Sequence, residues 1–356
     1  MKIAIVGAGI FGVVAADALA RSGHSVSLFD SRLEILSTAS AKNSNRLHLG
    51  FHYPRDLETA IQSKEGYLKF KDAFPEACNF AFPCFYALSK ESSKTNLESF
   101  LGFVEQASLK MQEINLNILA NYGFDTDKVS HAWLTQEGVI DFPTLKRFLM
   151  KRLLLNGVEL RLGANVETIS LSNLSWRVEC NRGKEIFDFV VLATYGVDNI
   201  EIQNMGFRES ESMYQATMIL QVELPLPHFG VTVIDGDFLT ILPKGFSRSS
   251  TIYAPGPSVI FQSRNLSEVR RMINSKSHRI EHALLLEQRF REYFPQTKVK
   301  FDGDCLVTIR NIESSSKTTD KRVSYLRELA PNLLSIRSGK IDHAISISEE
   351  IVQRTQ

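Results

Sequence analysis

The sequence predicts an α/β fold in which a Rossmann-like domain is interleaved with a second domain that contains an antiparallel sheet. Residues 2–30 follow the order strand, glycine turn, helix, strand and acid. The continuous apolar run at 187–194 is typical of a buried strand in a parallel sheet. Residues 332–336 are expected to form another short strand, which a glycine and a helical pattern follow. These segments predict one parallel sheet whose strands are far apart in the chain.

The N-terminal segment has the pattern of a dinucleotide-binding turn. Gly7 permits the tight turn, Gly9 lets the backbone approach a pyrophosphate, and Gly12 lets the helix pack closely on the strand. The free N–H groups at the helix start then face the phosphates. Asp30 follows at the spacing where a carboxylate can hydrogen-bond a ribose hydroxyl. The alternative is a structural turn that binds nothing, but the complete strand–turn–helix–strand context favours a dinucleotide site.

The apolar spacing predicts the remaining elements. Apolar residues three and four positions apart indicate helices, which we expect at residues 57–74, 97–111, 144–155 and 266–294. A loop is expected at 37–45, and short strands at 80–88, 158–162, 166–171 and 176–180. Long alternating runs between 213 and 261 predict the antiparallel sheet. The nucleotide-binding domain should therefore comprise residues 1–75, 140–205 and 305–356, and the substrate domain residues 76–139 and 206–304.

The overall composition is that of an ordinary globular protein. The 356 residues are 44% hydrophobic and 23% charged, and the net charge of +1 argues against a dedicated nucleic-acid-binding protein. The 4 cysteines lack a CxxC spacing, so neither a zinc site nor a disulfide framework is expected. No apolar stretch approaches the roughly 20 residues of a membrane span, and the N-terminal apolar run is too short for a signal peptide. A cytoplasmic protein is expected.

Short segments beyond the glycine turn carry a family resemblance. They are residues 43–53 (NSNRLHLGFHY), 138–141 (GVID), 189–194 (FVVLAT) and 338–343 (SGKIDH). Together with the N-terminal motif, they resemble the flavin-dependent amine and hydroxy-acid oxidoreductases of the D-amino-acid oxidase and glycine oxidase type. Segment 43–53 is locally most similar to that of L-2-hydroxyglutarate dehydrogenases and oxidases, although Asn45, Arg46 and His52 depart from their pattern.

The resemblance implies FAD as the cofactor, bound by a domain of the glutathione-reductase type. In such proteins the second domain covers the flavin, and the C-terminal strand, glycine and helix close on its ring. The cofactor contacts that the resemblance and the N-terminal motif imply are Gly7, Gly9, Ile10, Phe11, Gly12, Asp30, Ser31, Arg32, Asn45, Arg46, Leu47, His48, Val166, Ala193, Thr194, Gly339, Lys340 and Ile341.

Four residues are expected to carry the chemistry. His48 is expected to be the base, because an imidazole titrates near neutral pH and can take a proton as hydride leaves; alternatively, it only hydrogen-bonds flavin or backbone. Arg46 and Arg310 are expected to grip a carboxylate through a bidentate guanidinium, unless Arg310 is a surface residue. Lys340 is expected to stabilise negative charge on reduced flavin; alternatively, it is a solvated lysine. His48 and His52 could share a face, but no third ligand has suitable spacing, so no metal is expected.

These features favour an FAD-dependent dehydrogenase or oxidase acting on a C–OH or C–NH bond of a small polar substrate, a carboxylate or a sugar derivative. The sequence has no second GxGxxG, so bound nicotinamide is not expected, and the electron acceptor is oxygen, a quinone or another compound. One alternative is a sugar-nucleotide mutase, for which Arg208, Lys244 and Arg248 offer a sparse basic groove. The other is a flavin-fold binding protein without catalysis. The sequence does not predict an oligomeric state.

Overall fold

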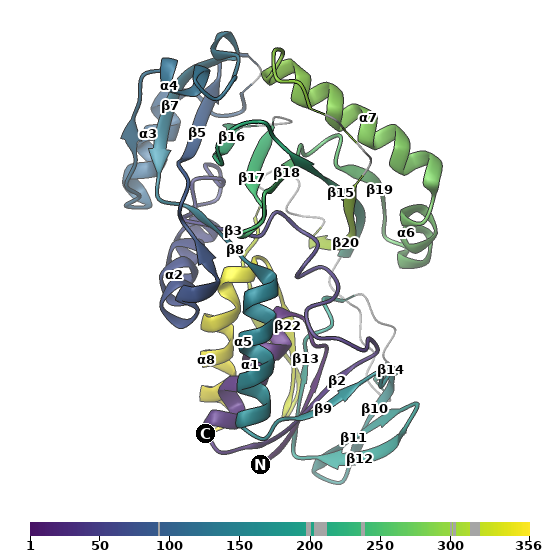
Figure 1. The fold of residues 1–356 in the computed structure, drawn as a ribbon. Coiled ribbons are helices and arrows are strands. Elements are labelled where there is room, and N and C mark those ends of the chain that lie inside the picture. Colours follow the sequence, from purple (N-terminus) through teal and green to yellow (C-terminus); the bar gives the residue numbers. More distant parts are fainter. Residues whose placement is uncertain are drawn as a thin grey trace.

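The molecule has two lobes, one built on a parallel sheet and one on a larger, mostly antiparallel sheet (Figure 1). The computed structural model describes residues 1–91, 93–196, 201–202, 212–235, 239–299, 301, 304–313 and 321–356. Within these residues, no helix combines the length and the apolar character needed to cross a membrane.

The parallel sheet is assembled from distant parts of the chain. Its 6 strands have the order β21-β22-β13-β1-β2-β9. They are β1 (Lys2–Val6), β2 (Ser25–Asp30), β9 (Glu159–Leu162), β13 (Phe189–Leu192), β21 (Tyr325–Ala330) and β22 (Leu333–Arg337). β1 pairs in parallel with both β2 and β13, and β13 pairs in parallel with β22. β9 pairs in parallel with β2, whereas the edge strand β21 is antiparallel to β22. The predicted strands therefore meet in one sheet, which confirms the predicted fold class.

Alternate side chains of the central strand β1 face two different cores. Ile3 and Ile5 pack with apolar residues of the helices α1 (Ile10–Arg21), α5 (Phe142–Leu155) and α8 (Ala344–Arg354). Ala4 and Val6 pack on the other face against the small sheet of β10 (Val166–Ser172), β11 (Ser175–Cys180), β12 (Gly183–Phe187) and β14 (Glu201–Ile202). Because successive side chains of a strand point to opposite faces, both faces of the sheet need this cover. Described residues thus cover both faces of the sheet, while the ends of its strands are left for a ligand.

The second lobe contains a 9-stranded sheet, in the order β19-β15-β18-β17-β16-β5-β7-β6 with β20 paired to β15. Its strands are β5 (Cys84–Ser89), β6 (Gln112–Glu113), β7 (Val129–Thr135), β15 (Ser212–Glu223), β16 (Gly230–Ile234), β17 (Thr240–Pro243), β18 (Ser249–Tyr253), β19 (Val259–Ser263) and β20 (Cys305–Glu313). All neighbours are antiparallel except β16 and β5. The helices α6 (Leu266–Ile273) and α7 (Lys276–Tyr293) contact β15 and β19.

Two expected boundaries differ from the structure. β20 was expected to belong to the nucleotide-binding domain, but it pairs along its whole length with β15, from Cys305 opposite Leu220 to Glu313 opposite Ser212. The helix expected at 97–111 is α3 (Leu97–Gln106) and ends early, because Ser108 adopts a left-handed backbone with φ of 49°. By contrast, α2 (Leu57–Ala73) and α5 match their predicted ranges closely.

A small three-stranded sheet connects the lobes. It consists of β3 (Arg46–Leu47), β8 (Gly138–Ile140) and β4 (Cys78–Asn79), in that order. β3 is continuous with the segment that contains His48, so the pairing of β3 with β8 fixes this segment at the junction of the lobes.

Candidate active site

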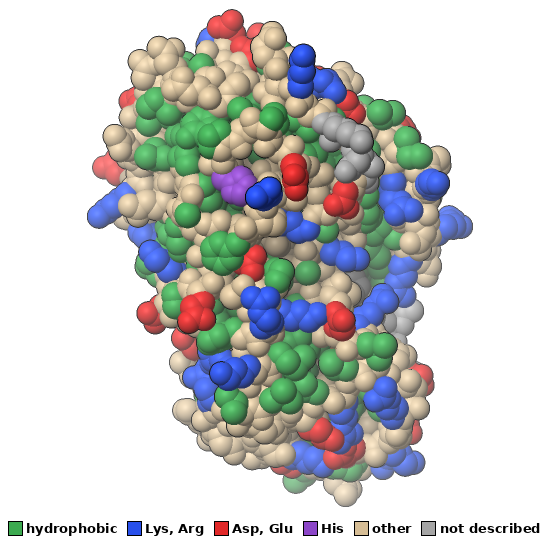
Figure 2. Space-filling model, in the orientation of Figure 1, with side chains coloured by type: hydrophobic (Ala, Val, Ile, Leu, Met, Phe, Trp, Pro, Cys, Tyr) green, Lys and Arg blue, Asp and Glu red, His purple; other side chains and the backbone are tan. Residues whose placement is uncertain are grey.

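A cavity of 1690 Å³ extends from the parallel sheet to the antiparallel sheet. One wall follows the carboxyl ends of the parallel strands: Gly7 comes after β1, Asp30 ends β2, Ala193 follows β13, and Ser338 follows β22. This is the edge at which open α/β sheets bind ligands. The opposite wall is formed by β15, β18 and β20. Lys and Arg side chains gather across the middle of the molecule, between the two lobes (Figure 2).

The glycine turn forms one end of the cavity. A Cβ atom on Gly12 would lie 1.8 Å from the carbonyl oxygen of Gly7, and one on Gly7 would lie 2.5 Å from that of Ala193. Gly9 is the N-cap of helix α1, which has no side-chain cap and no acidic residue in its first turn. The Ile10 N–H donates to Ser40 Oγ at 3.0 Å, while the other N–H groups of the first turn have no intrahelical partner. The turn therefore offers backbone donors and a helix N-terminus to an anion.

Asp30 lies beside this turn at the end of β2. Its Oδ2 accepts a hydrogen bond from the Ala8 N–H and its Oδ1 accepts one from the Arg32 N–H, both at 2.7 Å. These bonds fix the carboxylate against the glycine turn. Asn165 also lines the cavity, whereas the neighbouring Val166 is buried at 6% exposure and is not among the lining residues.

His48 and His52 form the buried centre of the site together with Tyr53. The ring centroids of the two histidines are 6.0 Å apart, and the centroid of Tyr53 lies 5.7 Å from that of His48. The Nδ1 atoms of both histidines and the Tyr53 hydroxyl are enclosed without a hydrogen-bond partner. Burial, and then the charges of Lys340 and Arg46, hold the pKa of both histidines well below 6.5. Both rings are consequently neutral at neutral pH.

The C-terminal turn brings Lys340 and Asp342 to the same centre. Asp342 Oδ2 accepts a hydrogen bond from the His48 N–H at 3.1 Å. The Lys340 ammonium lies 4.8 Å from the centroid of the Tyr53 ring. Burial lowers the pKa of Lys340 to about 7 and raises the pKa of Asp342 to about 7. The charge of each residue acts against burial, since Asp342 raises the pKa of Lys340 and Lys340 lowers the pKa of Asp342. Their protonation is therefore coupled and changes near neutral pH.

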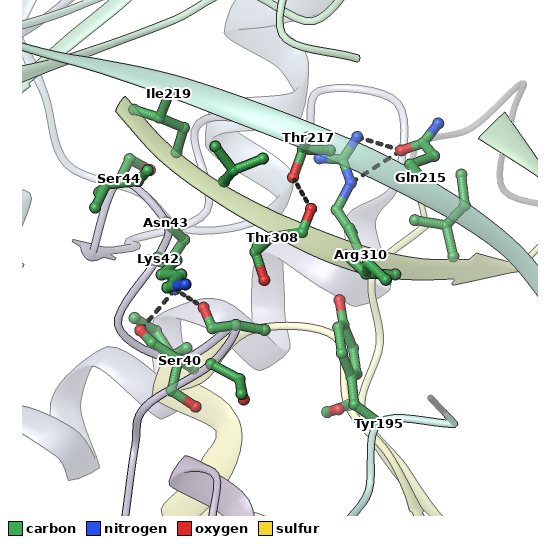
Figure 3. Close-up of a pocket in the computed structure, with 18 of the residues that line it drawn as sticks. Ser40, Lys42, Asn43, Ser44, Tyr195, Gln215, Thr217, Ile219, Thr308 and Arg310 are labelled. Atoms are coloured by element: carbon green, nitrogen blue, oxygen red, sulfur yellow. Dashed lines mark hydrogen bonds between the residues drawn. The ribbon is translucent and has the colours of Figure 1, made fainter. Parts of the chain in front are cut away.

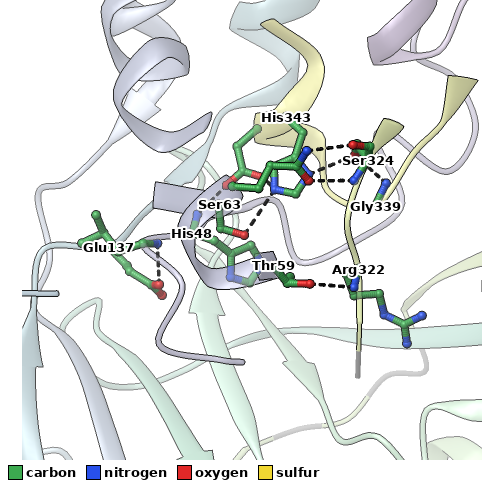
Figure 4. Close-up of polar contacts among 11 residues, drawn as sticks. His48, Thr59, Ser63, Glu137, Arg322, Ser324, Gly339 and His343 are labelled. Atoms are coloured by element: carbon green, nitrogen blue, oxygen red, sulfur yellow. Dashed lines mark hydrogen bonds and ion pairs between the residues drawn. The ribbon is translucent and has the colours of Figure 1, made fainter. Parts of the chain in front are cut away.

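His343 holds this turn through contacts with two serines. Its Nε2 lies 3.2 Å from Ser63 Oγ and its Nδ1 lies 2.9 Å from Ser324 Oγ, which also accepts the Gly339 N–H at 2.7 Å (Figure 4). Burial lowers the pKa of His343 to about 3, so the ring is neutral. The two serines and the histidine thus fix the backbone from which Lys340 reaches the cavity.

Arg46 lies in the cavity wall but is committed to protein acceptors. Its guanidinium donates to Tyr86 and Thr232 and lies 3.5 Å from Glu137 Oε2. Glu137 is fully buried and accepts hydrogen bonds from the Tyr86 hydroxyl at 2.8 Å and from the Leu49 N–H at 2.7 Å. Glu137 thereby holds the segment on both sides of His48. Sequence reasoning missed it, although it directly precedes the GVID segment.

Replacing Glu137 with alanine should lower the free energy of unfolding by about 3–5 kcal/mol, because it leaves the Arg46 charge buried and unpaired. Chemical denaturation of the purified variant measures this loss. The matched control is Glu349→Ala, which removes an exposed partner of Lys69 and should change stability by less than about 0.5 kcal/mol. Equal stabilities of the two variants would contradict the structural role of Glu137.

Arg310 lies on β20, in the cavity wall that the antiparallel sheet forms opposite the parallel strands. Its Nε and one terminal nitrogen donate to Gln215 Oε1 at 3.0 and 2.6 Å (Figure 3). The other terminal nitrogen donates to the Tyr253 hydroxyl at 3.1 Å. Within the described part of the chain, no carboxylate pairs with it. The partners are neutral, so they orient the guanidinium without cancelling its charge. Tyr195 points its hydroxyl toward this arginine from below (Figure 3).

The structure brings most of the residues predicted from sequence to this one cavity. The predicted residues that line it are Gly7, Gly9, Ile10, Phe11, Asp30, Ser31, Arg32, Arg46, His48, Ala193, Thr194, Arg310, Gly339, Lys340 and Ile341. The other predicted residues, which do not line it, are Gly12, Asn45, Leu47 and Val166. Lys244 and Arg248 do not line it, and Arg208 lies outside the described residues. No group of three or more His, Cys, Asp or Glu side chains in the described ranges could hold a metal ion.

A Rossmann-like sheet that faces a cavity under an antiparallel sheet is an arrangement typical of flavoprotein oxidoreductases. Residues 2–322 match the model of the DAO family, described as FAD dependent oxidoreductase, and the chain therefore belongs to this family. The chain is an FAD-dependent oxidoreductase, and the likeness to the D-amino-acid oxidase type is confirmed.

Relatives with curated descriptions cover the whole chain. The FAD-dependent monooxygenase FPY4 of Fusarium mangiferae is 26% identical over 356 residues, which span 99% of this chain and 90% of the relative. The FAD-dependent monooxygenase kojA of Aspergillus flavus is 27% identical over 376 residues, spanning 99% and 85%.

Solved structures share the fold at low sequence identity. Glycine oxidase from Geobacillus kaustophilus has a TM-score of 0.74 at 14% identity, covering 99% of this chain and 95% of that one. L-alpha-glycerophosphate oxidase from Mycoplasma pneumoniae, solved with FAD bound, has a TM-score of 0.78 at 15% identity, with coverage of 99% and 94%.

FAD is the cofactor of this family, and the described residues fit it. The glycine turn leaves space in front of Gly9, where the nearest atom to an added Cβ would be Ser40 Oγ at 3.4 Å. Asp30 is fixed at the end of β2, where it can reach a ribose. The enclosed, unpartnered atoms of His48, His52 and Tyr53 provide polar partners in the buried part of the cavity.

Proposed function

We propose that this protein oxidises a C–OH or C–NH bond of a small anionic substrate, with His48 taking the proton and Arg310 holding a carboxylate. The observation that carries the proposal is that a neutral, unpartnered histidine and an unneutralised arginine line the same cavity as the dinucleotide turn. FAD supplies, when bound, a two-electron acceptor. In the proposed reaction, the substrate C–H bond breaks with its electron pair leaving as hydride, the O–H or N–H proton passes to His48, and the carbon becomes C=O or C=N.

Arg310 orients the substrate in this proposal. The Arg310 guanidinium already donates to Gln215 and Tyr253, which are both neutral. Because it has five N–H donors, it can still donate to a carboxylate of the substrate. A charge-assisted hydrogen bond in a buried site is worth more than an exposed one. Arg46, by contrast, was expected to bind the substrate carboxylate, but Glu137, Tyr86 and Thr232 already occupy its guanidinium.

A second candidate is monooxygenation, which is favoured by the names of FPY4 and kojA. The two functions differ in their source of electrons. An oxidase or dehydrogenase takes electrons from its substrate, whereas a flavin monooxygenase that hydroxylates its substrate requires a separate reductant. Anaerobic mixing of the holoenzyme with hydroxy acids and amino acids, without nicotinamide, separates them. Bleaching of the flavin band supports the proposal, and bleaching only by added NADH or NADPH would favour the monooxygenase.

The rate of substrate oxidation should follow a bell-shaped pH profile. His48 must be neutral to accept a proton, and its lowered pKa places the rising limb below pH 6.5. Lys340 must be charged to stabilise negative charge, and its pKa of about 7 places the falling limb near neutrality rather than near 10.5. Lys340→Arg keeps the cation at all accessible pH values, so it should move the falling limb to higher pH. Superimposable profiles of the wild type and this variant would contradict the role of Lys340.

A further inference from the structure

Arg310 belongs to a row of polar side chains that crosses three neighbouring strands of the antiparallel sheet. Gln215 on β15 is directly opposite Arg310 on β20, and on its other side it is opposite Gln262 on β19. All three residues line the cavity. The next pair along the same two strands, Ala216 and Ile309, packs instead in the core beneath α6 and α7. Because successive side chains of a strand point to opposite faces, Gln215 and Arg310 both face the cavity.

Hydrogen bonds on both sides fix the orientation of the Gln215 amide. Its Oε1 accepts from Arg310 Nε and from one terminal nitrogen of Arg310, at 3.0 and 2.6 Å (Figure 3). Its Nε2 donates to Gln262 Oε1 at 3.2 Å. Since an arginine only donates hydrogen bonds, the amide oxygen must lie on the side of Arg310. Gln215 is buried, so these contacts hold the guanidinium in one orientation.

Gln215 occupies a position from which a carboxylate would cancel the charge of Arg310. A glutamate has the same length and could accept the same two hydrogen bonds as a bidentate ion pair. The amide accepts these bonds but is uncharged, so the guanidinium stays positive. The acidic residues that line the cavity, Asp30 and Asp235, have other partners. Asp30 accepts from backbone N–H groups, and Asp235 pairs with Arg55 at 2.7 Å.

The Arg310 guanidinium keeps donors as well as charge for a ligand. Three of its N–H groups donate to Gln215 and Tyr253 within the described part of the chain. An arginine side chain has five N–H groups, so one remains on each terminal nitrogen. A neutral ligand can accept these donors too, but only an anion also gains from the uncancelled charge. The charge of Arg310 therefore decides which of two ligands of equal shape binds more tightly.

We propose that Gln215 determines the charge selectivity of the substrate site, because it orients Arg310 with an uncharged partner and so makes the site select a carboxylate over the corresponding amide. Gln215 acts through Arg310, so it is a positioning residue and takes no part in the oxidation itself. This inference rests on the proposed function, in which Arg310 holds a substrate carboxylate. It adds the residue that keeps this anchor selective for an acid.

The test compares an acid with its own amide as ligands of the FAD-loaded protein. Suitable pairs are butanoate with butanamide and 3-phenylpropanoate with 3-phenylpropanamide. The change in flavin absorbance during titration gives the Kd of each ligand, and the ratio of the amide Kd to the acid Kd measures charge selectivity without turnover. We expect the wild type to bind the acid roughly tenfold more tightly than the amide, because charge-assisted hydrogen bonds are stronger than neutral ones.

Three variants assign this preference to the charge at position 215. Gln215→Glu should abolish the preference by weakening acid binding roughly tenfold, while amide binding stays within about threefold of the wild type. Gln215→Met removes the acceptor without adding charge, so it should weaken acid binding but keep the acid preferred. The matched control Gln112→Glu adds the same charge on the exposed strand β6, away from the cavity, and should behave as the wild type. Retention of bound FAD shows that each variant is folded.

Arg310→Gln separates this inference from the proposed function, because it should abolish the acid preference by removing the anchor itself. An acid preference that survives in Gln215→Glu but not in Arg310→Gln would overturn the role of Gln215 and leave the anchor intact. A loss as complete in Gln215→Met as in Gln215→Glu would also overturn it, because the charge at this position would then not decide selectivity. A wild type without the preference, or an Arg310→Gln protein that keeps it, would instead contradict the carboxylate anchor of the proposed function.

Discussion

Replacement of His48 by alanine is expected to slow substrate oxidation by about 10²–10⁴-fold, which is the usual contribution of a positioned general base. The imidazole is neutral because burial and the charges of Lys340 and Arg46 lower its pKa. No described residue hydrogen-bonds its ring, so it is free to take the substrate proton. The rate of flavin bleaching in anaerobic stopped-flow experiments measures this effect directly.

The matched control for His48 is His131. Its Nδ1 is also enclosed without a partner, but its ring stacks on Trp133 and it does not line the cavity. His131→Ala should therefore leave the bleaching rate within about twofold of the wild type, whatever its effect on stability. His48→Ala with normal FAD content and an unchanged rate would show that another group accepts the proton.

Replacement of Gly12 by alanine is expected to weaken FAD binding by more than about tenfold. The new Cβ would lie 1.8 Å from the Gly7 carbonyl oxygen and 3.2 Å from Ala193 Cβ. The first of these contacts is with backbone, so no side-chain rotation relieves it. Either α1 moves away from β1 or the glycine turn deforms, and both displace the donors that face the pyrophosphate. Overpacking of this kind also costs about 1–3 kcal/mol of stability.

Gly102→Ala is the control for this substitution. Gly102 lies within α3, and an added Cβ would meet no atom within 4 Å. Alanine should be neutral or slightly stabilising there, because glycine weakens a helix interior by about 1 kcal/mol. The measurement is the flavin absorbance per protein after dialysis and reloading with FAD. A Gly12→Ala protein that retains FAD as well as Gly102→Ala would contradict the close-packing role of this glycine.

The parallel sheet could be predicted from the sequence because the patterns that indicate its strands lie within short segments of the chain. Its central strands β1 and β13 are continuous apolar runs, and the first is joined to a glycine turn with a defined physical role. The position of β20 could not be predicted in this way. Its pairing partner β15 lies about a hundred residues earlier, as the Arg310–Gln215 contact with a separation of 95 residues shows. Register of this kind depends on tertiary packing rather than on propensity.

The same limit applies to the site. His48, Arg310 and Lys340 were found because each lies in a segment with a recognisable pattern. Glu137 and Asp342 act on the His48 segment across 88 and 294 residues, and no local pattern indicates such contacts. Arg46 illustrates the reverse case, since its position near His48 suggested a substrate grip, while three buried partners from other elements already satisfy its guanidinium.

In the proposed reaction, the substrate itself delivers a hydride to FAD in this cavity. The most direct measurement is the anaerobic rate of flavin bleaching by a reactive hydroxy or amino acid, compared with the same acid carrying deuterium on the carbon that is oxidised. We expect bleaching without nicotinamide and a slower rate with the deuterated acid, because the C–H bond breaks as the flavin is reduced. Bleaching at the same rate with both acids, or bleaching only after addition of NADH or NADPH, would contradict it.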